Sequence, residues 1–380
     1  MKKLSLIVLS LLICSNSFAK VQYGSSEHFF LGAEIELQFP NGSITGDKAK
    51  VLTVYPSEEQ PLELSYAEMV IFPDFIGDPD AQIGGHDFTT SLTNFKNNLN
   101  AIINQPGASY LPKILSIVNE EMTINQTNIA EHKPLEISNE DHIKFNCATG
   151  GGCDPISALV NHGLYFKISL NNYDHFGQSA IDSYIAGHYL AVEKAQNAQS
   201  EDDLKLAYAY EGYAVHFLTD LFSAGHLRTP RIALTKWCEY SDAAISSYLA
   251  KVMHDEDIKN GIWFSRSDGD TWYGFGDNLL FINDNSDNHQ RMKDVVQKSA
   301  DQVYAAFNHQ ITADDAIKEA ATWAPDLEAI NNNPRSQPAL FSEIDGDMKE
   351  YVDGHYSTIH SCLATAIKYG FISNELYYIN

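Results

Sequence analysis

The stretch His216-Phe-Leu-Thr-Asp220-Leu-Phe-Ser-Ala-Gly-His226 is the most informative part of this 380-residue chain. It closes a helical pattern over 202–222, in which apolar residues recur at three- and four-residue spacing. His216 and Asp220 are four residues apart, so a helix places both side chains on one face. Gly225 indicates that the helix ends or bends there, which brings His226 within reach of the same site.

The surroundings of this His–Asp pair are apolar. They are formed by Val215, Phe217, Leu218, Leu221 and Phe222. A buried His and a buried Asp each need a polar partner. Two imidazoles and a carboxylate are ligand types that zinc prefers, so a shared cation is one such partner. A His–Asp hydrogen bond within the core is the other, and both interpretations stay open at this point.

Helical patterns dominate the rest of the chain and predict a mostly α fold, with a single multi-helix domain over 20–325. The expected helices are Glu27–Gln38, Thr93–Asn104, Tyr110–Gln126, Gln178–Gln196, Asp202–Phe222, Thr235–Met253, Gln290–Phe307 and Ala313–Ala324. Strand-like segments occur at Lys50–Tyr55 and Tyr165–Leu170, and Trp263–Gly274 predicts a hairpin. Long loops are expected over Pro40–Pro61 and Phe72–Phe88, and long loops in a compact domain are often functional.

The pattern changes near the C-terminus. Asn331-Asn332-Asn333-Pro334 predicts a break, and Ser357–Tyr369 predicts a last helix. We therefore expect residues 326–380 to form a small C-terminal appendage on the main domain.

The N-terminus is typical of a secretory signal peptide over residues 1–19. Lys2 and Lys3 precede the apolar run Leu4–Ile13, and Ser17-Phe18-Ala19 resembles a cleavage site. The apolar run is too short to span a bilayer, and no later segment predicts a transmembrane anchor. We expect an exported protein that begins at Lys20 and is periplasmic or secreted.

Cysteine and charge content narrow the possibilities further. Of the cysteines beyond the leader, Cys147 and Cys153 flank a short Gly-rich loop and could form a disulfide, with free buried thiols as the alternative. The formal net charge of −25 repels nucleic acid and anionic membranes at long range. It favours a neutral or zwitterionic substrate over nucleic acid, although bound cations would reverse the sign locally.

Several further His and Asp residues have a notable order along the chain. With the central stretch they read His28, Asp74, His175, His216, Asp220, His226 and His254. This order resembles the zinc-dependent phospholipase C family and the related fungal single-strand-specific nucleases. The sequence around these residues is most similar to a gram-negative branch of these phospholipases. The segments that carry this resemblance are Tyr23-Gly-Ser-Ser-Glu-His28, Asp74-Phe-Ile-Gly-Asp-Pro79, Asp174-His-Phe-Gly177, His216 to Arg231 and Met253-His-Asp-Glu-Asp257.

The resemblance implies a site of three clustered zinc ions. His216 and Asp220 would hold one ion, with Asp220 bridging to a second. Asp74 and His175 would hold that second ion, and Asp74 would also be the general base toward the attacking water. His226 and His254 would hold the third. His28 would complete the set from the N-terminal helix.

The chain departs from the family pattern at two points. The family has a carboxylate four residues after its last His, where this chain has Ile258. Asp257 is the nominated replacement, with Asp255 in reserve. The family also uses an N-terminal Trp as a zinc ligand, whereas the expected N-terminus here is Lys20, so a different cleavage site or Glu27 would have to fill that role.

These observations predict a zinc-dependent phosphodiester hydrolase acting on a phospholipid at a membrane surface. By resemblance, phosphatidylcholine would be split into diacylglycerol and phosphocholine. Phe75 and Phe176 could face a quaternary ammonium group or belong to the core, and Arg228 and Arg231 could reach a phosphate or form surface salt bridges. The alternatives are a zinc-dependent nuclease or nucleotidase, and a secreted metal-binding protein without enzymatic activity.

Overall fold

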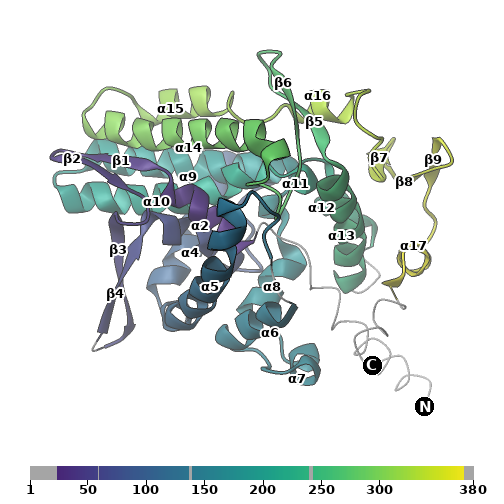
Figure 1. Cartoon of the computed structure of the whole chain (residues 1–380), viewed down its shortest axis with the longest axis horizontal. Helices are drawn as coiled ribbons and strands as arrows, with labels where there is room; N and C mark the ends of the chain where they lie inside the picture. The colour runs from purple at the N-terminus through teal and green to yellow at the C-terminus, as the bar shows by residue number, and fades with distance from the viewer. Residues whose placement is uncertain (1–23, 59, 137–138, 239–242, 372–380) are drawn as a thin grey trace.

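The computed structural model describes residues 24–58, 60–136, 139–238 and 243–371. The predicted signal peptide lies outside them. The described residues are mostly helical, with four small antiparallel sheets, which confirms the predicted fold class (Figure 1). None of the described helices is both long and apolar enough to cross a bilayer.

The helices are α2 Ser25–Ala33, α3 Tyr66–Ile71, α4 Phe88–Ile103, α5 Gly107–Ala130, α6 Asn139–Ala148, α7 Pro155–Val160, α8 Leu164–Asn171, α9 Gly177–Asn197, α10 Glu201–Asp220, α11 Ala224–Arg228, α12 Arg231–Trp237, α13 Ala243–Asn260, α14 Ser286–Phe307, α15 Ala313–Ala320, α16 Leu327–Asn331 and α17 Cys362–Lys368. Single 3₁₀ turns are η1 Phe72–Asp74, η2 Tyr173–His175 and η3 Asn283–Asn285. The strands are β1 Glu36–Phe39, β2 Gly42–Thr45, β3 Lys50–Ser57, β4 Gln60–Ser65, β5 Ile262–Ser265, β6 Thr271–Gly274, β7 Phe341–Ile344, β8 Asp347–Val352 and β9 His355–Thr358.

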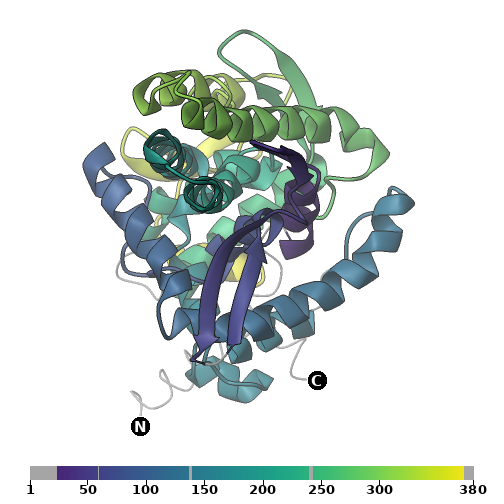
Figure 2. The same cartoon turned by 90° about the vertical axis from the view of Figure 1, so that its left-hand side faces the viewer.

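The centre of the fold is the pair α9 and α10, against which α3, α4 and α14 pack (Figures 1 and 2). Ser200 begins α10 by accepting the backbone N–H of Asp203, and three acidic residues in the first turn favour the positive end of the helix dipole. A Cβ at Gly187 would lie 2.6 Å from the Cβ of Ala214. Only glycine therefore lets α9 approach α10 this closely.

The hairpin prediction is confirmed, and several boundaries are corrected. β5 pairs with β6 in the predicted range, with Phe264 opposite Trp272. Tyr165–Leu170 is not a strand but lies in α8, because its apolar residues fit both the alternating spacing of a strand and the three- and four-residue spacing of a helix. The helix expected at Glu27–Gln38 ends at Ala33, and β1 follows. The expected loop over Pro40–Pro61 instead contains β2 and β3.

Two other expected helices are interrupted. The range Thr235–Met253 contains the end of α12 and the start of α13. Cys238 caps α12 and forms a disulfide with Cys362, a constraint that hydrophobic periodicity does not register. The range Ser357–Tyr369 contains the end of β9 and then α17, which Ser361 caps.

Both disulfides of the described residues close loops outside the central helix pair. Cys147–Cys153 is formed, so the free-thiol alternative is wrong for these two residues. Cys238–Cys362 joins positions 124 residues apart and was not predicted.

The buried apolar residues form two separate cores. The first core runs from Leu31 on α2 to Ile330 on α16 and surrounds α9 and α10. The second core joins α12 and α13 to β7, β8 and α17. The C-terminal appendage therefore contributes buried apolar side chains to the second core, mainly from residues after Ala339.

Candidate metal centre

Buried His and Asp side chains from seven parts of the fold meet at the C-terminal end of α10. Their donor atoms form three groups that could each hold a metal ion: His28, His216 and Asp220; Asp74, His175 and His216; and His226, His254 and Asp277. All eight residues are at most 2% exposed. The structure thus brings together every metal ligand predicted from the sequence except Asp257.

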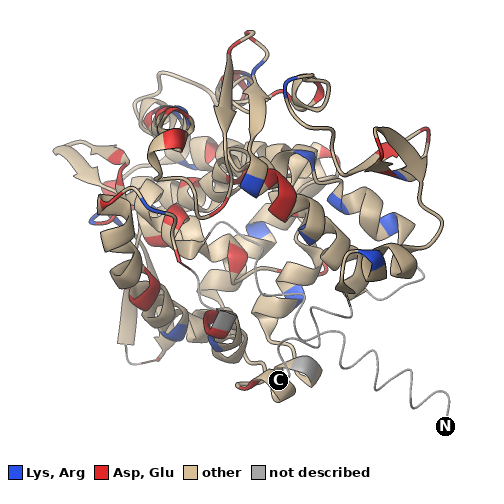
Figure 3. Ribbon diagram, turned by 45° about the vertical axis from the view of Figure 1, so that its right-hand side comes forward, with Lys and Arg blue, Asp and Glu red and all other residues tan. Residues whose placement is uncertain are grey.

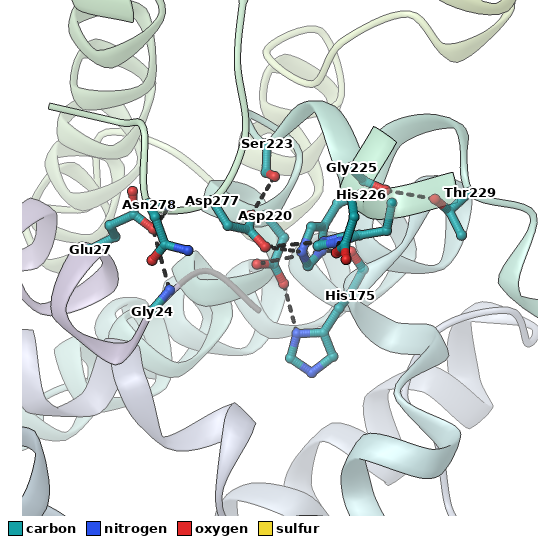
Figure 4. A network of polar contacts seen from close by, with 12 residues as sticks. Gly24, Glu27, His175, Asp220, Ser223, Gly225, His226, Thr229, Asp277 and Asn278 are labelled. Carbon is teal, nitrogen blue, oxygen red and sulfur yellow. Dashed lines mark hydrogen bonds and ion pairs between the residues drawn. The ribbon is translucent and has the colours of Figure 1, made fainter. Parts of the chain in front are cut away.

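Asp220 lies close to imidazoles of all three groups, and Figure 4 shows it beside His175 and His226. Its Oδ2 is 2.7 Å from Nδ1 of His175 and 3.5 Å from Nε2 of His216. Its Oδ1 is 3.5 Å from Nε2 of His28 and 3.7 Å from Nδ1 of His226. A carboxylate with a different set of neighbours at each oxygen has the geometry of a bridging ligand.

Hydrogen bonds to residues outside the cluster fix which nitrogen of His216 and of His28 faces it. His216 Nδ1 is 2.7 Å from the carbonyl oxygen of Val70, so Nδ1 carries the proton and Nε2 faces the cluster. The Thr219 hydroxyl donates to the His216 carbonyl and therefore accepts from His28 Nδ1, at 2.8 Å. His28 Nε2 then faces Asp220.

The group of His226, His254 and Asp277 is held in the same way. His226 Nδ1 donates to the carbonyl of His175, at 2.8 Å, so its Nε2 faces Asp277. His254 Nε2 lies 3.1 Å from Asp277 Oδ2. The Ser223 hydroxyl donates to Asp277 Oδ1 at 2.5 Å and fixes the carboxylate plane (Figure 4).

The nomination of Asp257 is corrected by this geometry. Asp257 forms a buried ion pair with Arg228, whose Nε is 3.1 Å from Oδ2. Asp257 belongs to none of the three groups, because the buried guanidinium of Arg228 engages both of its carboxylate oxygens. The reserve candidate, Asp255, contacts the outer nitrogen of His254, at 3.3 Å, and so orients that ring without joining the group.

Asp277 is the site residue that sequence reasoning missed. It lies in the loop after β6, 23 positions after His254, where helical spacing gives no signal. The available signal was Gly276: a Cβ there would lie 2.8 Å from Ser223 Oγ and 2.6 Å from a side-chain carbon of Ile258. Gly276 lets the loop pass between the end of α10 and α13.

Gly225, read from the sequence as the end of a helix, also makes room for a ligand. A Cβ at Gly225 would lie 2.5 Å from Cδ2 of His254. The His254 ring therefore packs directly on the backbone of α11, close to His226.

Glu27 does not supply a ligand to any of the three groups. Its carboxylate accepts the backbone N–H groups of Asn278 and Leu280, at 2.8 and 3.1 Å, and that of Gly24, at 3.3 Å (Figure 4). These bonds tie the loop of Asp277 to the start of α2. Burial, together with the nearby charge of Asp277, raises the pKa of Glu27 to about 8.

The electrostatics of the protein alone are unfavourable for the ionised cluster. Burial, followed by the charge of Asp220, raises the pKa of Asp74 well above its usual range. Burial, followed by the neighbouring imidazoles of His28 and His175, lowers the pKa of His216 well below its usual range. Burial also lowers the pKa of His175 to about 4. A cation would favour the ionised carboxylates and neutral imidazoles that ligation requires.

Unmet hydrogen-bonding capacity gives an independent test of fit. Asp74 Oδ1 and Asp220 Oδ1 are buried, and neither accepts a hydrogen bond from any described residue. Buried carboxylate oxygens of this kind are costly unless a cation or a donor satisfies them. The residues present therefore fit a metal ion, and these buried groups could hold one.

The aromatic and basic candidates lie in the interior. Phe75 packs against Phe145 and Tyr165, and Phe176 stacks on the His226 ring at a centroid distance of 4.7 Å. Arg228 and Arg231 are buried, so neither forms a surface salt bridge.

Arg231 donates to Asn172, just before His175, and to backbone carbonyls at the end of α8. It therefore holds the segment that leads into His175.

Comparison with protein-family models, with curated proteins and with solved structures gives no match.

Proposed function

We propose that this protein is an exported zinc-dependent phosphodiester hydrolase of the phospholipase C type. The observation that supports it is the convergence of five imidazoles and three carboxylates, all of them buried, in three groups of donor atoms. Two of the groups share His216, and the third lies next to Asp220 through His226. Such a nitrogen-rich donor set suits zinc better than magnesium or calcium, which prefer oxygen ligands.

The residues of the site have distinct parts in the proposed reaction. Zinc, when bound, supplies charge stabilisation at the phosphate oxygens and makes hydroxide available near neutral pH. Asp74 accepts the proton of the attacking water. The water oxygen bonds to phosphorus, the bond from phosphorus to the glycerol oxygen breaks, and that oxygen takes up the proton that Asp74 received. Asp220 holds the imidazoles of neighbouring groups in register, with Oδ1 and Oδ2 facing different rings.

The charge of the chain supports a phospholipid substrate over nucleic acid. Asp and Glu residues occur along many elements of the ribbon, and Lys and Arg residues are fewer, in keeping with the net charge of −25 (Figure 3). A polyanionic strand is repelled by such a surface, whereas a zwitterionic phosphatidylcholine surface is not. The proposed products are diacylglycerol and phosphocholine.

The direct test is phosphocholine release from phosphatidylcholine vesicles by the purified protein. We expect activity to disappear on chelation and to return with added zinc. Asp74→Asn is expected to abolish release, while Asp80→Asn, an exposed neighbour in the following loop, keeps it.

Hydrolysis of single-stranded DNA faster than of phospholipid would replace this proposal with the nuclease alternative. Metal-dependent melting without hydrolysis of either substrate would leave a metal-binding protein without this enzymatic activity.

A further inference from the structure

The second core lies against one of the three groups of donor atoms and not against the other two. His28, Asp74 and His216 lie on α2, η1 and α10, whose apolar neighbours belong to the first core. His254 lies on α13, whose apolar side chains instead belong to the second core. The His226, His254 and Asp277 group therefore lies at the junction of the two cores.

Helix α13 presents its apolar side chains to the C-terminal unit, which we define as β7, β8, β9 and α17. Tyr248, Leu249 and Met253 of α13 are buried with Phe341 of β7 and Met348 of β8. Met253 directly precedes His254, so the apolar contact and the donor atom are on adjacent residues.

Polar bonds join the same two parts. The backbone N–H of Phe341 donates to the Met253 sulfur at 3.4 Å, and the Tyr248 hydroxyl donates to the carbonyl of Tyr369 at 2.7 Å. Arg228 spans the junction, because it donates to the carbonyl of Gln337 at 2.7 Å while it pairs with Asp257 of α13.

A covalent bond closes the arrangement. Cys238, at the end of α12, is joined to Cys362, the first residue of α17. Both cysteines are buried in the second core. The disulfide thus keeps the C-terminal unit against α12 and α13.

We propose that the C-terminal unit is a support for α13 that sets the position of His254, and thereby the occupancy of the His226, His254 and Asp277 group. The supporting role follows from the two cores. Its effect on occupancy rests on the proposed metal centre. The groups of Asp74 and Asp220 do not depend on this support.

The two disulfides provide a matched test in the full-length protein. Cys238→Ala with Cys362→Ala removes the bond that holds the C-terminal unit, and Cys147→Ala with Cys153→Ala removes a bond that joins the end of α6 to the loop before α7. Two quantities are measured: zinc bound per chain at controlled free zinc, and hydrogen exchange of α13 in chelated protein.

We expect the first pair of substitutions to increase exchange in α13 and to weaken one zinc site by about 10- to 100-fold, as for changes that disturb ligand orientation. The other sites keep their affinity. The Cys147/Cys153 pair leaves both quantities unchanged.

A second pair of variants removes the dependence on disulfides. Phe341→Ala opens the second core, and Phe39→Ala opens the first core at β1. We expect Phe341→Ala to reproduce the weakened zinc site and the increased α13 exchange. Phe39→Ala is expected to lower overall stability without weakening one site selectively.

The outcomes separate the two proposals. Unchanged α13 exchange in both the Cys238/Cys362 and the Phe341 variants overturns the support. If hydrogen exchange of α13 increases but the zinc affinity of every site falls equally, the proposed selective effect on the His254 group is wrong. If the unmodified protein binds no zinc, the proposed function fails, and the exchange measurement still decides whether the C-terminal unit supports α13.

Discussion

Helix α10 carries two buried clusters of histidine and acid, and they differ in how their polar atoms are satisfied. In the middle of the helix, Glu211 accepts from His188 at 2.7 Å through one oxygen and from Ser299 through the other. His188 also contacts Gln302 Oε1, at 2.9 Å. At the end of the helix, Asp220 Oδ1 accepts no hydrogen bond from the described residues.

The comparison shows that burial of His and acid does not by itself indicate a metal site. Gln302 uses its amide N–H to donate to Glu319, so its oxygen faces His188, and both nitrogens of His188 act as donors. Burial opposes the charged form, but Glu211 raises the pKa of His188 above its usual value. The polar atoms of the His188 cluster therefore satisfy one another, whereas at Asp220 one buried carboxylate oxygen is left that a cation could satisfy.

The largest expected difference between the two clusters is in activity and metal content. Asp220→Asn should lower phosphodiester hydrolysis by about a thousandfold or more, since several kcal/mol of transition-state stabilisation are lost. Zinc per chain should fall in the same variant. Glu211→Gln, nine positions earlier on α10, should keep its zinc, measured by elemental analysis after dialysis. Equal zinc loss in both variants would remove the distinction between the clusters.

Metal removal should destabilise the protein through one cluster only. A ligand at a thousand times its dissociation constant stabilises the folded state by about 4 kcal/mol. We expect chelation to lower the melting temperature of the unmodified protein and of Glu211→Gln, and to have a much smaller effect on Asp220→Asn. The measurement is thermal unfolding with and without zinc, and a chelation-insensitive unmodified protein would contradict the proposed centre.

The His188 cluster should instead respond to pH. Removing one partner of a buried pair costs about 3–5 kcal/mol, so His188→Gln should lower the free energy of unfolding. Because the pKa of His188 is higher in the folded state, its stabilisation is complete below about pH 6.5 and is lost as pH rises through the raised value. The difference between unmodified and His188→Gln protein, measured by denaturant unfolding after chelation, should shrink with rising pH. A difference that grows would show that His188 is neutral when folded.

Substitution of an exposed histidine should affect neither the metal content nor the stability of the protein. His309 is exposed and has a φ of 56°, a conformation that asparagine tolerates well. His309→Asn should therefore change stability by less than about 0.5 kcal/mol and leave zinc content and hydrolysis unchanged. A loss of zinc in this variant would mean that the protein also binds metal at its surface.

Much of the site was predictable because its ligands follow local rules. His216 and Asp220 are one helical turn apart within an apolar pattern, so their shared face was fixed by sequence spacing. The order of His28, Asp74, His175, His226 and His254 extended the prediction through a family resemblance. The structure brings these residues together around Asp220.

Other features depended on contacts between distant parts of the chain. Asp277, and not Asp257, lies with His226 and His254, because the loop after β6 brings Asp277 to the end of α10. Asp257 instead forms an ion pair with Arg228. His188 has no acidic residue three or four positions away in the sequence, because its partner, Glu211, lies on a neighbouring helix. Local periodicity contains no information on such pairs.

The sequence by itself determined the helical class, the hairpin at β5 and β6, and the His–Asp pair of α10, since each depends on spacing within one element. Only the tertiary structure decided which carboxylate completes the group of His226 and His254, and which buried histidine is already satisfied. The physical reason is that a buried polar atom is stabilised by whichever partner the packing brings within about 3 Å, and that partner comes from another element of the fold.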